Sequence, residues 1–397
     1  MTSPSQFGAL EQRALLSVAT QFFVNGAVFA SFVPRLPEIR DVVDITVGEL
    51  GLLITIGGMI GLLGSLGASP IIERLGTRRT LIIGALALVG FLPVLGLART
   101  PYVLVIGFAG LQTFDVIVDV AMNLQGSWLS ARRHAPVMNR LHGLWSLGTV
   151  VGGLAASQLA GLGVSLRDHF FGVSALMFVV IVFVGRGLLR EDREFSHVAV
   201  TSHAEHRPEK VRGRGKRTAL AALAIAGGCA IVVELTSSDW AAFRLSDDFG
   251  AGAGFAGLAY VAFTSGMTLG RFGGDSVLVK IGSDQLFRGA LVLSFAGMAA
   301  ASLVPNRAVT IAAYMVAGVG ISTFFPKLYD DAARYPGKSG AGLGALTGGS
   351  RLAGFIAPAV VGALAATELS VGQASALVTL PTLGGLAVVS FTARRLS

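Results

Sequence analysis

Long runs of hydrophobic residues, separated by short polar stretches, repeat along the whole chain. A helix needs about 20 residues to cross the hydrocarbon core of a membrane. Runs of that length predict twelve membrane-spanning helices. They cover residues 14–34, 49–70, 80–98, 102–128, 140–162, 168–189, 218–240, 254–274, 285–304, 308–328, 341–366 and 371–393. The pattern therefore predicts an all-α polytopic membrane protein.

The polar stretch between the sixth and seventh runs, residues 190–217, is charged and lacks apolar periodicity. This composition is typical of a flexible linker. We therefore predict an N-terminal six-helix bundle at residues 1–189, a cytoplasmic linker at 190–217 and a C-terminal six-helix bundle at 218–397.

Similar loop sequences in the two halves indicate an internal repeat. The loop Glu73-Arg-Leu-Gly-Thr-Arg-Arg79 follows the second predicted helix, and Val279-Lys-Ile-Gly282 follows the eighth. Arg74 and Lys280 are 206 residues apart. Pseudo-symmetric halves of this kind are common in secondary transporters, which bind their solute between the repeats near the membrane midplane.

The Lys and Arg residues fall mainly in alternate loops. Counted along the predicted helices, 24 lie on one side and 6 on the other. Because positive residues accumulate on the cytoplasmic side, we expect both termini and the linker to be cytoplasmic in a multi-pass protein of the cell membrane. Arg351 is the one basic residue assigned to neither side, because it lies in the middle of the eleventh predicted helix.

Composition narrows the class further. Charged residues make up 14% of the chain, against about 25% in soluble domains. The net charge of +8 is spread over short loops, so we expect a lipid bilayer and no nucleic acid as the partner. The first hydrophobic run is as long as a full span and no small-residue cleavage site follows it, so we expect it to remain as the first helix.

Motifs of catalysis are absent from the sequence. A single cysteine, Cys229, excludes a disulfide framework and a Cys-based zinc site. No His-Glu-x-x-His or Gly-x-Ser-x-Gly motif occurs, and Pro336–Gly340 lacks the first glycine of a phosphate-binding loop. We expect no enzyme, no ATP-driven pump, and no metal or cofactor.

Two carboxylates lie inside the fourth predicted helix. Asp115 and Asp119 are four residues apart and share a polar face with Gln112 and Asn123. A charged Asp at mid-bilayer costs about 2.5–3.5 kcal/mol, so this face should avoid lipid. Side chains one turn apart, at about 5–6 Å, resist double ionisation, so at least one carboxylate is expected to hold a proton near neutral pH.

Asp119, then Asp115, are therefore the first candidates for proton coupling. The alternative is that they bond to neighbouring helices and only hold the packing. Glu234, in the seventh predicted helix, is a third candidate, with cavity and packing roles left open.

Candidates for solute binding come from several predicted helices. Gln21 and Asn25 share one face of the first helix, and Asn123 belongs to the polar face of the fourth. Tyr314 could stack on a ring-shaped solute, although aromatic side chains in membrane helices often serve packing.

Arg351 lies at a depth similar to that of Asp119. Its candidate partners are Asp119, Glu234 or an anionic group of the solute, and a purely structural ion pair is the alternative.

The loop Glu73–Arg79 resembles the signature of the major facilitator superfamily between helices two and three, with Glu73 in place of the usual Asp. Further blocks are similar to the fucose-permease-like branch. They are Asp119–Asn123, His142, Trp145, Ser146–Gly148, Glu234, Asp239–Trp240 and Gly270–Asp275. The chain departs from this branch at Gln21 and Asn25, where its sugar–proton symporters tend to have an acid.

This resemblance implies two bundles that rock about a central site lined by helices one, four, seven and ten. It also implies a cytoplasmic latch that pairs with helix ends of the opposite half. The latch candidates are Glu73, Arg74, Gly76, Arg78, Arg79 and Asp275. A solvated, positively charged loop is the alternative.

We expect a monomeric secondary transporter in a bacterial-type inner membrane that moves a small solute by alternating access, as a proton-coupled symporter. An uncoupled facilitator, an exporter of drugs or metabolites, and a non-transporting receptor are the alternatives.

Overall fold

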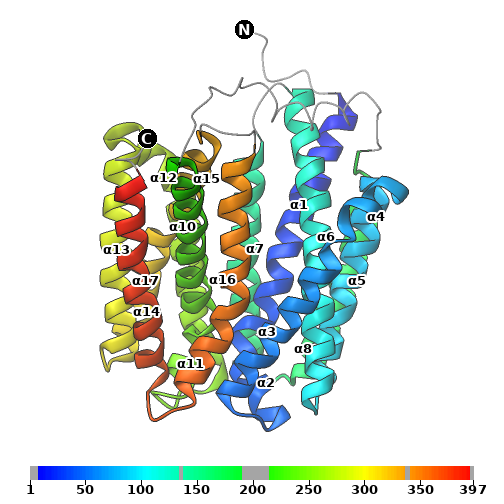
Figure 1. Ribbon diagram of the computed structural model, residues 1–397. Coiled ribbons are helices and arrows are strands. Elements are labelled where there is room, and N and C mark those ends of the chain that lie inside the picture. The colour runs from blue at the N-terminus through cyan, green and yellow to red at the C-terminus, as the bar shows by residue number, and fades with distance from the viewer. Residues whose placement is uncertain (1–7, 134–136, 190–213, 336–339, 394–397) are drawn as a thin grey trace. The chain divides into compact units, whose positions relative to one another are not determined.

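The computed structural model describes residues 8–133, 137–189, 214–335 and 340–393 (Figure 1). Helices form almost all of these ranges, and no strand occurs in them. Each predicted span corresponds to one long helix, except that 49–70 and 308–328 each reach into a second α-helix. The first half contains α1 (Ala9–Phe32), α3 (Val47–Ser65), α5 (Thr77–Leu97), α6 (Pro101–Arg133), α7 (Met138–Gly161) and α8 (Leu166–Gly185). The second half contains α10 (Arg214–Asp239), α12 (Ala253–Ile281), α13 (Ser283–Leu303), α14 (Arg307–Ile321) with α15 (Phe324–Ala333), α16 (Ala341–Ala365) and α17 (Val371–Ala393).

Ten helices in the described part of the chain are long and apolar enough to cross a membrane. These ten do not include α7 and α12, which have 24 and 29 residues. At 1.5 Å per residue they reach about 36 and 43 Å, which exceeds the thickness of the hydrocarbon core. The all-helical membrane fold predicted from the hydrophobic runs is confirmed.

Shorter elements lie between the long helices: η1 (Val33–Arg35), α2 (Leu36–Val43), α4 (Ala68–Leu75) and α11 (Ala241–Ser246). The second predicted span, 49–70, is therefore too long, because α3 ends at Ser65 and α4 is a separate helix. Helix α10 begins at Arg214, inside the predicted linker. The rest of that linker, residues 190–213, lies outside the described residues.

The tenth predicted span, 308–328, is not one helix. It breaks at Ser322 and Thr323, and α15 then continues to Ala333. Pro326 explains the break, since it has no N–H and its ring clashes with the carbonyl four residues earlier. The hydroxyl of Ser322 donates to the Val319 carbonyl at 2.7 Å, so part of the freed backbone is satisfied locally.

The internal repeat is visible in the helix bounds. Adding 206 to the bounds of α5 gives those of α13, and adding 206 to the start of α6 gives the start of α14. Gly76 and Gly282, also 206 residues apart, join α4 to α5 and α12 to α13 with φ angles of 79° and 81°. A side chain would be strained in this left-handed region, so glycine is favoured at both junctions.

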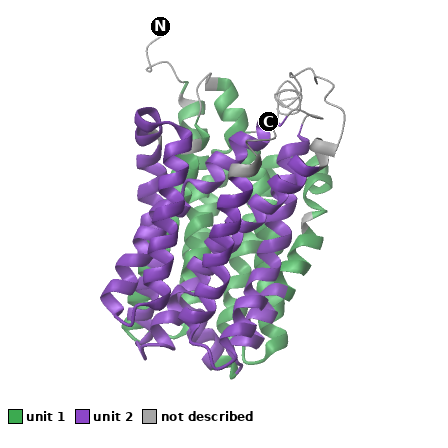
Figure 2. Cartoon of the chain, turned by 60° about the vertical axis from the view of Figure 1, so that its left-hand side comes forward, with its two compact units in different colours: residues 1–32, 42–44, 56–202 green, residues 33–41, 45–55, 203–397 purple. Residues whose placement is uncertain are grey.

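The chain forms two compact units (Figure 2). Unit 1 comprises residues 1–32, 42–44 and 56–202, and unit 2 comprises residues 33–41, 45–55 and 203–397. In unit 1, α1 packs on α7, and α5 packs on α6 and α8. In unit 2, α10 packs on α16 and α17, and α14 packs on α12 and α13. The predicted domain boundaries stay a prediction.

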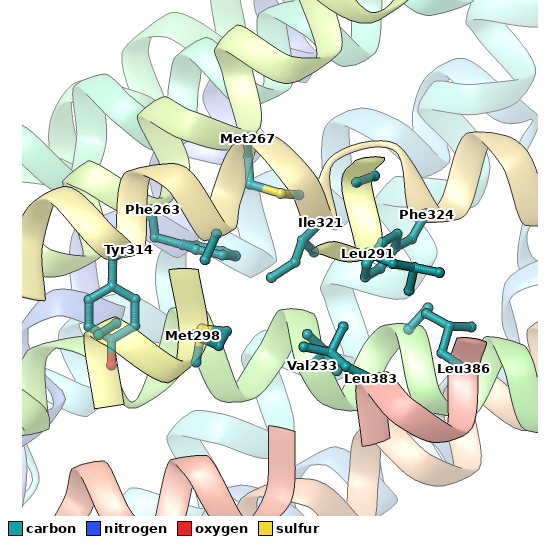
Figure 3. Close-up of a cluster of buried hydrophobic side chains, with 14 of the residues drawn as sticks. Val233, Phe263, Met267, Leu291, Met298, Tyr314, Ile321, Phe324, Leu383 and Leu386 are labelled. Carbon is teal, nitrogen blue, oxygen red and sulfur yellow. The ribbon is translucent and has the colours of Figure 1, made fainter. Parts of the chain in front are cut away.

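Residues 33–41 and 45–55 belong by sequence to the first half, yet they group with unit 2, where η1 contacts α10, α11 and α12. Unit 2 also has an apolar core that includes Val233, Phe263, Met298 and Leu383 (Figure 3). This core fixes the helices that carry Glu234 and Tyr314.

Candidate proton and solute site

In unit 1, three helices meet through one asparagine. The buried Asn25 of α1 donates from Nδ2 to Oδ1 of Asp115 on α6 at 2.9 Å. Its own Oδ1 accepts the indole N–H of Trp145 on α7 at 2.7 Å. The structure therefore brings together Asn25 and Asp115, two residues that the sequence assigned to different roles.

The second carboxylate is held within α6. Asn123 donates from Nδ2 to Oδ1 of Asp119 at 2.9 Å and to the Asp119 carbonyl at 2.8 Å. Both carboxylates thus accept a hydrogen bond from a neutral amide. An amide donor stabilises a carboxylate oxygen without adding charge, and a carboxylate has a second oxygen that can carry a proton.

Gln21 lies close to this network. Helices α1 and α6 are the first and fourth long helices of the alternating path, so they run antiparallel. Asn25 of α1 contacts Asp115 of α6. Gln21 lies one turn before Asn25, and Asp119 lies one turn after Asp115, so in antiparallel helices Gln21 and Asp119 are at the same level. Gln21 is 2% exposed and its Nε2 has no hydrogen-bond partner in the described structure. A buried donor of this kind costs free energy until an acceptor reaches it, which suits a solute oxygen.

Glycines hold α1 close to α7. A side chain at Gly26 would collide with the carbonyl of Trp145, and one at Gly148 would collide with the carbonyl of Phe23. Small residues allow two backbones to approach closely in a membrane. The α1–α7 pair therefore fixes Asn25 and Trp145 relative to each other.

Glu234 has different surroundings. In unit 2, Arg271 of α12 approaches Glu234 of α10 with an N–O distance of 3.9 Å. Arg271 belongs to the Gly270–Asp275 block and was not among the sequence candidates. Arg351, a candidate partner of Glu234 from the sequence, lies exposed on α16.

Tyr314 lies inside the unit 2 core beside Phe263 and Met298 (Figure 3). It is fully buried and its hydroxyl has no hydrogen-bond partner in the described part of the chain. This position favours packing over solute contact.

All of the latch candidates except Asp275 lie at the α4–α5 junction. Glu73, Arg74 and Arg79 are exposed. Arg78 donates from Nε to the Gly185 carbonyl at the end of α8 at 2.9 Å, so in this structure it bonds within unit 1. Asp275 lies in α12, and its side chain lies outside the described part of the structure.

Sequence reasoning missed a group of buried or partly buried arginines in unit 2 that pair with acids. Arg35 is 1% exposed and bonds Glu38 through two nitrogens, at 2.8 and 2.6 Å. Arg244 is also buried and bonds Asp248 at 2.5 Å. Arg40 pairs with Asp247. These arginines counted only as loop charges in the orientation count, although an acid three or four residues after Arg35 and Arg244 was a detectable signal.

Among the described residues, no group of three His, Cys, Asp or Glu side chains could hold a metal ion.

Residues 18–358 match the Major Facilitator Superfamily. The chain is 26% identical over 314 residues to an uncharacterised MFS-type transporter of Yersinia pestis, covering 79% of each protein. It is 27% identical over 326 residues to the membrane protein MosC of Rhizobium meliloti, covering 80% of this chain and 75% of MosC.

Solved structures share the fold. The crystal structure of the nucleoside transporter NupG aligns with a TM-score of 0.69 at 11% identity, covering 98% of this chain and 99% of NupG. A bacterial homologue of the human lysosomal transporter Spinster, in an inward-facing and occupied conformation, aligns with a TM-score of 0.68 at 14% identity, covering 99% and 98%.

Proposed function

Because the chain belongs to the major facilitator superfamily, we propose that it moves a small solute across the cytoplasmic membrane by alternating access, coupled to protons at Asp115 and Asp119. That it is a membrane transporter of this type follows from the family. The observation that carries the coupling is the pair of carboxylates on α6, each held by a neutral amide.

Protonation is the step that these contacts support. Asn25 and Asn123 each donate to Oδ1 of one acid, and a carboxyl group can carry a proton on its other oxygen. A proton on one acid removes the repulsion between two charges one turn apart. Gain and loss of this charge can then bias the transporter between its two conformations.

The solute is proposed to bind beside the acids. The unpartnered Nε2 of Gln21 supplies a donor, and Asn123 and Asp119 supply further polar groups at the same level. Arg351 is kept as a candidate for a solute anion. The likeness to the fucose-permease-like branch supports a hydrophilic solute and remains part of this proposal.

The orientation is proposed from the loop charges, with both termini and the linker in the cytoplasm and Glu73–Arg79 as a cytoplasmic latch. Single cysteines at Ser3, Thr201 and Ser397 in a Cys229→Ala background should react with impermeant reagents only from the cytoplasmic side. Reaction at Thr201 from outside intact cells would overturn this orientation.

A thermal-shift screen of the purified transporter would identify the solute. The panel would hold monosaccharides, polyols, nucleosides, amino acids and amphipathic amines. A binder raises the melting temperature in proportion to RT ln(1 + [L]/Kd). Proteoliposomes then distinguish coupled transport from the alternatives, because an uncoupled facilitator equilibrates the binder without accumulating it, whereas a receptor shows no flux.

A further inference from the structure

We propose that Trp145 is a positioning residue for the proton site, because its indole N–H fixes the orientation of the Asn25 amide and thereby the oxygen of Asp115 that takes the proton. This inference rests on the proposed function. It assigns a role to a tryptophan on α7 whose indole N–H bonds Asn25, the residue that donates to Asp115.

The orientation of an asparagine amide depends on its neighbours, because its oxygen and nitrogen have similar shapes. The indole nitrogen of tryptophan can only donate. At 2.7 Å from Asn25 it therefore requires the amide oxygen to face α7. The amide nitrogen must then face Asp115, where it lies 2.9 Å from Oδ1.

This orientation decides which oxygen of Asp115 can be protonated. Nδ2 of Asn25 can only donate, so Oδ1 of Asp115 must act as an acceptor. A proton held by Asp115 then lies on Oδ2. Without the indole N–H, the amide is free to turn over and present its oxygen, which accepts a hydrogen bond from a protonated carboxyl group.

The backbone around Trp145 leaves it little freedom. The Trp145 carbonyl lies against Gly26, so close that a side chain there would collide with it. The separation between Trp145 and Asn25 is therefore fixed, whereas Asp115 belongs to a third helix, α6. The network joins a fixed α1–α7 pair to the acid of a third helix.

Other titratable groups face the same region and must be separated in any test. Asp119 lies one turn from Asp115 on α6, and His142 lies one turn before Trp145 on α7. The His142 ring packs against Phe22 of α1 with centroids 5.2 Å apart. On the face of α1, Asn25 and Gln21 are polar but do not titrate.

The direct test reads the indole itself and needs no solute. The chain has three tryptophans, so a protein with Trp128→Phe and Trp240→Phe reports on Trp145 alone. We expect its emission to change as the purified protein is titrated with acid, and we expect Asp115→Asn to abolish that change. An unchanged titration after Asp115→Asn would contradict the proposal.

Trp128 provides a matched control in unit 1. It is buried on α6, and its Nε1 has no hydrogen-bond partner in the described structure. A protein that keeps only Trp128 should show no Asp115-dependent change. An equal Asp115-dependent response from Trp128 would mean that the signal reports general rearrangement, which would also overturn the proposal.

A second measurement tests the orienting role. The melting temperature is recorded against pH for four proteins: the wild type, Asp115→Asn, Trp145→Phe, and the double variant. Subtracting the Asp115→Asn curve from its parent, once with Trp145 and once with Trp145→Phe, gives two difference curves that report on Asp115. Loss of the indole donor should move the midpoint of the difference curve by about one pH unit to higher pH, a tenfold change in proton affinity. An unmoved midpoint would show that Trp145 only packs.

Replacement of Trp145 by β-(3-benzothienyl)alanine keeps the ring shape and removes the N–H, and it serves if Trp145→Phe does not fold. Failure of the inference is distinguishable from failure of the proposed function. The former leaves the Trp145 signal and the midpoint independent of Asp115, whereas the latter appears as pH-driven accumulation that survives neutralisation of both acids.

Discussion

The acids of the two units are held by different chemistry. On α6 of unit 1, Asp115 accepts a hydrogen bond from the amide of Asn25, and Asp119 accepts one from the amide of Asn123. In unit 2, arginines approach two of the acids: Arg244 bonds Asp248 at 2.5 Å, and Arg271 approaches Glu234 at 3.9 Å. Asp239 of the same unit instead accepts a hydrogen bond from the Ser238 hydroxyl at 2.7 Å. The ion-paired acids of unit 2 and the amide-held acids of α6 therefore respond differently to a proton.

An acid paired with a buried arginine gains little from protonation, because the proton would leave the arginine charge without its partner. An acid held by an amide can gain or lose a proton without stranding a second charge. This comparison supports our proposal that the proton couples through unit 1 and that the ion pairs of unit 2 are structural.

The internal repeat sharpens this comparison. Adding 206 to Asp115 and Asp119 gives Ile321 and Phe325, and Ile321 belongs to the unit 2 core. The two positions that correspond to the acids of α6 are thus apolar, and the break between α14 and α15 lies between them. The two halves share helix bounds at α5 and α13, but the acids of α6 have no acidic counterpart at the matching positions of the second half.

The largest effect on stability is expected at Asp248. Its carboxylate bonds the buried Arg244 and accepts the N–H groups of Val371 and Gly372 at 2.9 and 2.8 Å. Asp248→Ala leaves a buried charge without its partner, and we expect a loss of about 3–5 kcal/mol in unfolding free energy. A denaturant titration of the purified protein measures this.

The exposed pair Arg334–Asp330, at 3.7 Å on α15, is the matched control. Asp330→Ala should change the unfolding free energy by less than about 1 kcal/mol. Equal losses for Asp248→Ala and Asp330→Ala would contradict a structural role for the buried pair.

A smaller effect is expected at Thr55 in unit 2. Its hydroxyl accepts the N–H of Ala359 at 3.2 Å, directly after Pro358 in the interior of α16. Thr55→Val keeps the shape and removes the acceptor, so we expect a loss of about 1–3 kcal/mol in unfolding free energy. Thr367→Val, at an exposed hydroxyl after α16, is the control. If both variants unfold alike, the Thr55 hydrogen bond does not support α16.

The smallest effect on stability is expected at Glu234. The partly exposed, 3.9 Å pair with Arg271 is worth less than about 1 kcal/mol. Glu234→Gln should therefore fold and keep pH-driven accumulation in proteoliposomes. Loss of accumulation with solute exchange intact would return Glu234 to the proton pathway and break the contrast between the units.

The hydrophobic runs were enough to predict the helices, because a membrane requires each crossing to be long, apolar and internally hydrogen-bonded. The internal repeat with an offset of 206 residues was visible in the spacing of Arg74 and Lys280. The same offset relates the bounds of α5 and α13. The break of α14 was readable from Pro326 but was overlooked within a continuous apolar run.

The candidate site was predictable only in part. The stripe through Asp115 and Asp119 followed from helical spacing. The contact of Asn25 with Trp145 did not, since residues 120 positions apart meet only when α1 packs on α7. The pairing of Glu234 with Arg271 likewise depends on the packing of α10 on α12.

The central claim is that the acids of α6 carry the coupling proton. Its most direct test compares exchange and accumulation in proteoliposomes, with the binder found by the thermal-shift screen as labelled solute. Asp119→Asn resembles the protonated acid, so exchange between two loaded compartments should persist while accumulation driven by a pH gradient disappears. Accumulation at the wild-type level by the double variant Asp115→Asn with Asp119→Asn would contradict the claim.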